Sequence, residues 1–142
     1  MLRALIVFPL LIIPIVFYLL ISMTAGEGGT AMRLQANLFS MPMMSGERWA
    51  FSLGDFILLT GLIFLFIEII KAARTKSDAI VNHSLSMVLL LFCVIGFLVI
   101  PGFGTSVFFL LMIMTLLDVV AGPIVSIVAA RRDFGIGEGM GG

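Results

Sequence analysis

The stretch Thr105–Ala130, TSVFFLLMIMTLLDVVAGPIVSIVAA, decides the fold of this chain. It contains one charged residue, Asp118, and is followed directly by Arg131 and Arg132. A transmembrane helix needs about 20 mostly apolar residues, because the hydrocarbon core of a bilayer is about 30 Å thick and each helical residue rises about 1.5 Å. The stretch therefore predicts a helix over 105–130 that crosses a membrane.

Three further apolar stretches meet the same criterion, over residues 4–23, 53–72 and 81–100. Their apolar residues are continuous, whereas the strands of a transmembrane β-barrel alternate apolar and polar residues. The sequence therefore predicts an all-α integral membrane protein, with four transmembrane helices in a single membrane domain of residues 1–142.

The first of these stretches has a second interpretation, because a cleaved signal peptide also begins with a basic residue and an apolar run. Its apolar run is longer than the 7–15 residues or so that are typical of such a peptide. We therefore expect a retained helix. Pro9 and Pro14 lie inside it and are expected to kink or loosen it, since each removes a backbone hydrogen bond.

The composition restricts the class of protein further. Apolar residues make up 61% of the 142 residues and charged residues 11%, with eight basic side chains against eight acidic ones. This balance excludes a disordered chain, a basic nucleic-acid-binding surface and an ordinary soluble domain. The sequence also contains no motif of a catalytic triad, a phosphate-binding loop or a metal site. We therefore expect neither an enzyme nor a bound cofactor.

The basic residues predict the orientation, because cytoplasmic segments of membrane proteins carry an excess of Lys and Arg. If both termini share one side, six basic residues lie there, and only two lie on the other side, Arg33 and Arg48. The six are Arg3, Lys71, Arg74, Lys76, Arg131 and Arg132. Both termini are therefore predicted to be cytoplasmic, and in a bacterial cell the protein would lie in the inner membrane. Tyr18 and Trp49 are predicted to lie at the outer interface, where amphipathic aromatic rings are common.

The predicted exoplasmic loop, residues 24–48, contains two patterns. Apolar residues at helical spacing predict a short interfacial helix; they are Ala31, Leu34, Leu38 and Met41. Met41, Met43 and Met44 lie close together, and thioethers are ligands that suit Cu(I). Methionine is also a common filler of apolar contacts, and we prefer this second interpretation. At the other end of the chain, the glycine-rich residues 135–142 are expected to form a flexible tail.

Two helices are predicted to carry small or polar residues along one face. In the last helix the spacing of four places Asp118, Gly122, Ser126 and Ala130 on one stripe, and small residues in such a stripe let another helix approach closely. In the second helix Gly54, Gly61 and Glu68 recur every seven residues, and Ser52 with Asp55 has the spacing of a capping box at its start.

Asp118 is the most informative residue, because a carboxyl group near the middle of a transmembrane helix is costly and is usually functional or paired. We find no basic residue at its predicted depth, so Asp118 is expected to be protonated, as a structural link between helices, or to pair with a cation from another subunit or a substrate. Glu68 is expected mainly to pair with Lys71 at the surface, but lies near enough in depth to form a two-carboxyl site with Asp118.

These features favour a non-catalytic accessory or structural subunit of a larger membrane complex, or a homo-oligomer. The expected partners are the lipid bilayer and other transmembrane helices, and we expect no binding to nucleic acid. The alternative is a small ion- or proton-coupled transporter centred on Asp118.

Overall fold

The computed structural model describes residues 8–26, 29–74 and 79–137 and is mostly helical. Three of its helices are long and apolar enough to cross a membrane: α4 (Leu53–Arg74), α5 (Ala79–Val99) and α6 (Ser106–Gly137). A fourth apolar helix, α2 (Ile12–Ala25), is shorter. The chain is therefore an integral membrane protein.

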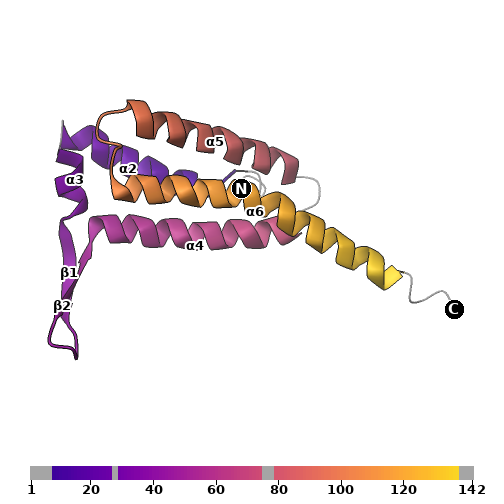
Figure 1. Ribbon diagram of the computed structural model, residues 1–142, viewed down its shortest axis with the longest axis horizontal. Coiled ribbons are helices and arrows are strands. Elements are labelled where there is room, and N and C mark those ends of the chain that lie inside the picture. The colour runs from indigo at the N-terminus through magenta and orange to yellow at the C-terminus, as the bar shows by residue number, and fades with distance from the viewer. Residues whose placement is uncertain (1–7, 27–28, 75–78, 138–142) are drawn as a thin grey trace.

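The long helices lie side by side, with α6 between α4 and α5, and α2 packs against α4 and α6 (Figure 1). Successive long helices run in opposite directions, so the turn between α5 and α6 lies at the end of the bundle where α4 begins. We call this the hairpin end, because a β-hairpin projects from it. The C-terminal part of α6 bends away from the direction of its first part (Figure 1), and Pro123 inside the helix accounts for a bend, because it removes one backbone hydrogen bond.

Helix α2 begins at Ile12, later than the predicted start at residue 4, and residues 4–7 lie outside the described part of the chain. Pro14 occupies its first turn, where a backbone N–H has no helical partner in any case. Pro9 precedes the helix. Neither proline therefore interrupts α2 itself, and the expected loosening of a helix over 4–23 involves residues 4–7, which lie outside the described part of the chain. Its 14 residues span about 21 Å, less than the thickness of a hydrocarbon core.

The core at the hairpin end is aromatic. Tyr18 of α2 contacts Phe103 and Phe108, with ring centroids 5.5 Å and 4.9 Å away, and all three side chains are buried. The ring of Tyr18 therefore packs inward, against the turn between α5 and α6. Gly102 makes the turn with a φ of 86°, and a Cβ there would lie 2.8 Å from Ser22 Oγ, so glycine is required both by conformation and by space.

The loop between α2 and α4 contains a hairpin in addition to a helix, which corrects the all-α prediction. The short helix α3 covers only Gly29–Leu34, and the chain then forms strands β1 (Asn37–Pro42) and β2 (Arg48–Ser52), which pair antiparallel. Leu38 and Met41, expected on the helix, lie in β1. The large apolar residues Phe39 and Met41 in β1, and Trp49 and Phe51 in β2, are two positions apart, and this period of two is the pattern of a strand.

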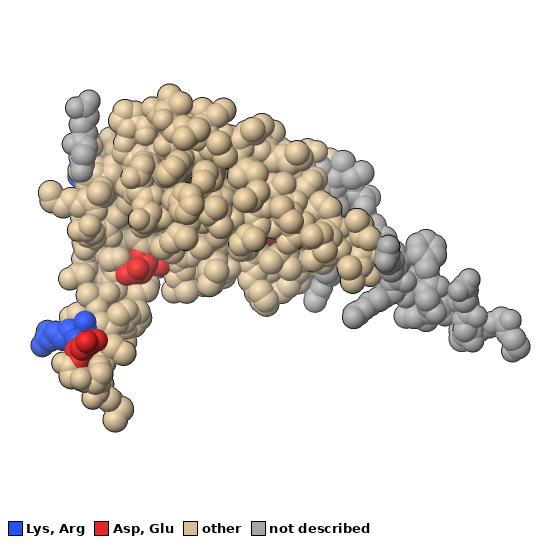
Figure 2. Space-filling view, viewed as in Figure 1, with Lys and Arg blue, Asp and Glu red and all other residues tan. Residues whose placement is uncertain are grey.

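The start of α4 confirms the predicted capping box. The Asp55 carboxylate accepts hydrogen bonds from the backbone N–H and the hydroxyl of Ser52, at 2.9 Å and 2.7 Å, and the Asp55 N–H donates back to Ser52 Oγ. At the far end of the chain, α6 continues to Gly137. The first three residues of the expected tail are therefore helical, and residues 138–142 lie outside the described part. On the face shown in Figure 2, charged side chains gather over the hairpin and the start of α4, and the helices are otherwise almost free of charge.

Candidate functional site

Both predicted small-residue stripes contact other helices of the same chain. A Cβ added at Gly54 would lie 2.9 Å from Val107 of α6, and one added at Gly61 would lie 2.9 Å from the sulfur of Met114. These close approaches explain why α4 and α6 pack tightly along this seam. At Gly54 and Gly61 this seam is therefore filled by side chains of the same chain.

Asp118 also has a partner in its own chain. Its side chain is buried, and the hydroxyl of Ser86 on α5 donates a 2.7 Å hydrogen bond to Asp118 Oδ2. One turn further along the stripe, a Cβ on Gly122 would lie 3.8 Å from His83 Nδ1, which is an ordinary contact. The expectation that Asp118 has no partner within the chain was therefore wrong. Ser126 and Ala130 continue the stripe along α6, but their side chains lie outside what the structure describes.

Glu68 forms the predicted ion pair with Lys71, at 2.9 Å, but not at the surface. Its side chain is 0% exposed, whereas that of Lys71 is 14% exposed. Burial follows from the chain that precedes α2, which covers this end of α4. The backbone N–H of Leu10 donates to Glu68 Oε1, and Lys71 Nζ donates to the carbonyl of Phe8 at 3.1 Å. The ion pair therefore satisfies the backbone groups on both sides of Pro9, where the chain is not helical.

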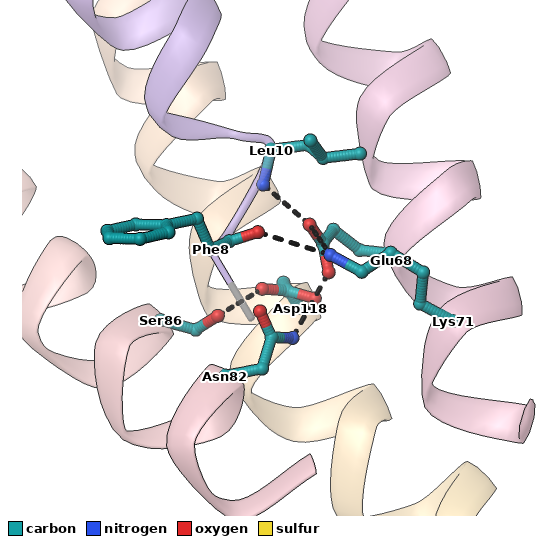
Figure 3. A network of polar contacts seen from close by, with 7 residues as sticks. All are labelled: Phe8, Leu10, Glu68, Lys71, Asn82, Ser86 and Asp118. Atoms are coloured by element: carbon teal, nitrogen blue, oxygen red, sulfur yellow. Dashed lines mark hydrogen bonds and ion pairs between the residues drawn. The ribbon is translucent and has the colours of Figure 1, made fainter. Parts of the chain in front are cut away.

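Asn82 of α5 bonds to one of the two acidic groups and lies beside the other (Figure 3). Its Nδ2 donates to Glu68 Oε2 at 3.2 Å, and the adjacent turn of the same helix carries Ser86, the partner of Asp118. Figure 3 shows the amide of Asn82 beside the carboxyl group of Asp118, with its hydrogen bond running to Glu68. The Oδ1 atom of Asn82 is buried and has no hydrogen-bond donor among the described residues. An unsatisfied buried acceptor is costly, so a donor or a cation at this place would be stabilising.

We define the polar cluster as the side chains of Glu68, Lys71, Asn82, Ser86 and Asp118 (Figure 3). It lies inside the predicted spans, away from the hairpin end. It contains two carboxyl groups and one ammonium group, and can therefore hold one more positive charge. The sequence indicated the two acids and the lysine. It did not single out Asn82 and Ser86, although polar residues four apart in an apolar helix are a signal that they share one face.

The methionines of the predicted exoplasmic loop lie in the hairpin. Met41 lies in β1 opposite Trp49, and Met43 and Met44 follow in the turn of the hairpin. All three are exposed. Among residues 8–26, 29–74 and 79–137, no three His, Cys, Asp or Glu side chains are placed to hold a metal ion.

The cluster combines features of a structural network and of an ion site. Direct hydrogen bonds join α4, α5, α6 and the chain before α2, which is what holds short helices together in lipid. Among the described residues, the second carboxyl group has no ammonium partner of its own and Asn82 Oδ1 has no donor, and an exchangeable proton or cation would need such groups. No family model, curated protein or solved structure matches the chain in the comparisons that we made.

Proposed function

We propose that this protein is an ion- or proton-coupled membrane protein that binds one exchangeable positive charge in the polar cluster. The observation that carries the proposal is the burial of Glu68 and Asp118 in one cluster with a single lysine. A buried carboxylate without a countercharge is costly in a membrane, and binding a proton or a monovalent cation removes that cost.

Asp118 is the better candidate for the exchanging group. Glu68 already accepts from Leu10, Lys71 and Asn82, whereas the described chain donates to Asp118 through Ser86. A proton on Asp118 would supply a donor next to Asn82 Oδ1, and a cation could instead use the oxygen atoms of both residues. His83, on the same turn of α5 as Asn82, is a further titratable group that faces this end of α6.

The topology of a four-span protein fits this proposal. We infer that α2 and the residues before it form the fourth span, with both termini on the side that carries the six basic residues. By the positive-inside rule this side is cytoplasmic, and in a bacterium the membrane would be the inner one. The polar cluster would then lie in the cytoplasmic half of the membrane, because it is near the C-terminal end of α4 and the start of α5.

A non-catalytic accessory or structural subunit, or a homo-oligomer, is the second candidate. It is favoured by the full pairing of Glu68, because an acid whose acceptors are all used by the chain itself acts as a structural link. On this hypothesis Asp118 and Ser86 are likewise a link between α5 and α6, and the cluster binds nothing.

The two candidates are separated by Asp118→Asn, with Asp55→Asn as the matched control, because Asp55 is an exposed acid at the other end of α4 and lies outside the polar cluster. Asparagine keeps the shape and can still accept from Ser86, but it cannot exchange a proton or carry a charge. The purified variants are compared by thermal unfolding in Na⁺, K⁺ or choline chloride, and by ion and proton flux into proteoliposomes under an imposed membrane potential.

If the proposal is right, Na⁺, K⁺ or a lower pH stabilises the wild type, flux is measurable, and both effects are lost in Asp118→Asn while Asp55→Asn retains them. A wild type without any ion- or pH-dependent stabilisation or flux would contradict the proposal. So would an Asp118→Asn variant that behaves as the wild type does. Copurification of defined partner proteins in equal amounts with both variants would then support the structural role.

A further inference from the structure

The β-hairpin has one strongly apolar face. Directly opposed residues of an antiparallel pair lie on the same face, and successive residues alternate between faces. The pairs Phe39–Phe51 and Met41–Trp49 therefore share one face. The opposite face carries the two intervening pairs, which are Ser40–Ala50 and Pro42–Arg48. We call the first set, Phe39, Met41, Trp49 and Phe51, the aromatic face.

The aromatic face is organised but uncovered. The rings of Phe39 and Phe51 stack with centroids 4.9 Å apart, and the Trp49 ring lies 5.7 Å from Phe51. Nevertheless Phe39 is 47% exposed and Trp49 is 46% exposed. A two-stranded hairpin is marginally stable in water unless an apolar face is packed against something. The surroundings of the hairpin in the membrane must therefore supply the cover.

The position of the hairpin indicates what that cover is. It projects from the start of α4 and runs across the direction of the helices, beyond the side of the bundle that α4 forms (Figure 1). Strand β2 ends at Ser52, and the predicted span of α4 begins at the next residue. The hairpin therefore lies at the level where α4 enters the bilayer, parallel to its surface.

The space in the angle between the hairpin and α4 is continuous with the lipid-facing side of α4. Large apolar side chains on that helix are exposed along its length; Phe56, Leu59, Ile63 and Phe66 are among them. In a membrane this space is filled by lipid. The exposed carboxylate of Asp55, in the first turn of α4, marks the polar level of the interface at the base of the hairpin.

The charges on the hairpin indicate which face is turned toward the lipid. Arg48 is the only basic residue of the hairpin and belongs to the face opposite Trp49. Figure 2 shows the basic side chain over the hairpin on the side that points away from the helices. The aromatic face is therefore turned toward the side on which the helices, and hence the bilayer, extend.

We propose that the aromatic face of the hairpin binds the surface of the lipid bilayer, with the Trp49 and phenylalanine rings at the level of the headgroups and the first acyl carbons. Trp is enriched at this level because its ring is apolar and its N–H is polar. The hairpin acts as an interfacial anchor that fixes the depth and tilt of α4 in the bilayer. This proposal depends only on the membrane insertion of α4 and not on the polar cluster.

Trp49 is the only tryptophan of the chain, so its fluorescence reports on the aromatic face alone. The full-length protein is reconstituted at high lipid-to-protein ratio into vesicles of phosphatidylcholine and phosphatidylglycerol. We expect blue-shifted emission, strong quenching by lipids brominated near the headgroup, weaker quenching by lipids brominated near the acyl methyl end, and little quenching by iodide.

A matched control moves the tryptophan to the opposite face by combining Trp49→Phe with Ala50→Trp. This reporter should be quenched by iodide and much less by brominated lipid. Three results would overturn the proposal. The first is quenching of Trp49 by iodide and not by lipid, which would place the face in water. The second is protection from both quenchers, which would indicate a second copy of the chain or another protein. The third is equal lipid quenching at positions 49 and 50.

Discussion

The hydroxyl of Tyr18 donates a 2.7 Å hydrogen bond to the carbonyl oxygen of Gly102, 84 residues further along the chain. The same hydroxyl lies 2.7 Å from Thr105 Oγ1. Because Tyr18 is fully buried, this hydrogen bond lies in the core of the bundle and links α2 to the turn between α5 and α6. This contact explains how a helix too short to span a hydrocarbon core is nevertheless held at a defined position in the bundle.

Replacing Tyr18 by Phe should destabilise the protein although it preserves the ring. The change leaves the Gly102 carbonyl without this donor, and we expect a loss of about 1 kcal/mol in the free energy of unfolding. The measurement is a denaturation curve in mixed detergent micelles. The control is Ile13→Val on the exposed side of the same helix, which should cost less; equal losses for the two variants would contradict the role of the hydroxyl.

Ser52→Ala should cost about 1 kcal/mol, because it removes the cap of α4. Asp55→Ala should cost a similar amount. The two side chains bond to each other and to each other's backbone, so the double variant should be less destabilised than the sum of the single ones. This is measured by the same denaturation curves. Strict additivity would show that the two residues act independently, against the capping-box assignment.

The close approach of α4 and α6 makes Gly61 less tolerant of substitution than Gly122. An alanine at Gly61 would place its Cβ 2.9 Å from the sulfur of Met114 and 3.0 Å from Leu111, and overpacking of this kind costs about 1–3 kcal/mol. Alanine at Gly122 meets only an ordinary contact with His83 and should be nearly neutral. Gly104→Ala is the control, since no atom lies within 4 Å of the added Cβ. Stability measurements that rank Gly122→Ala as the most harmful would reverse this assignment.

The spans were predictable because a continuous apolar run of about 20 residues has few alternatives in lipid. The Ser52–Asp55 cap was predictable because its partners are three residues apart. The hairpin was not, because apolar residues at Ala31, Leu34, Leu38 and Met41 fit a helix, while the period of two in β1 becomes visible only when it is paired with β2. A short segment whose apolar spacing fits both a helix and a strand takes the structure that its tertiary contacts favour, which for β1 is pairing with β2.

The hydrogen-bond partners of Asp118 and Glu68 could not be predicted from local sequence patterns, for a different reason. Ser86 lies 32 residues from Asp118, and it reaches the carboxyl group only if α5 is rotated to present this face to α6. The burial of Glu68 likewise depends on the backbone at Phe8 and Leu10, more than 50 residues away, which carries no side-chain signal. Such contacts follow from tertiary packing and not from periodicity.

Lys71→Met should be strongly destabilising, because it leaves the carboxylate of Glu68 buried without its countercharge and removes the donor to the Phe8 carbonyl. Loss of one partner of a buried ion pair costs about 3 kcal/mol or more. The double variant Glu68→Gln with Lys71→Met removes both charges and should recover a large part of this loss. Unfolding curves of the three proteins test the coupling, and a double variant as unstable as Lys71→Met would contradict it.

The final prediction concerns the short helix α2 and the number of membrane crossings. Single cysteines are introduced at Leu2, Glu47 and Thr75 in a Cys93→Ala background, since Cys93 is the only native cysteine. They are labelled with an impermeant maleimide in intact cells and after lysis. If α2 and the residues before it cross the membrane, Glu47 is labelled in intact cells, and the positions at 2 and 75 only after lysis.

The labelling of Leu2 decides between two arrangements, because the 14 residues of α2 are too few to span a hydrocarbon core by themselves. If α2 entered the membrane and returned, the cysteine at position 2 would be labelled together with that at 47, while position 75 stayed protected. That result would leave three spans and put the termini on opposite sides. It would also change the membrane depth of the backbone at Phe8 and Leu10. The hydrogen bonds from this backbone to Lys71 and Glu68 would then hold a re-entrant segment in place, and not the start of a fourth span.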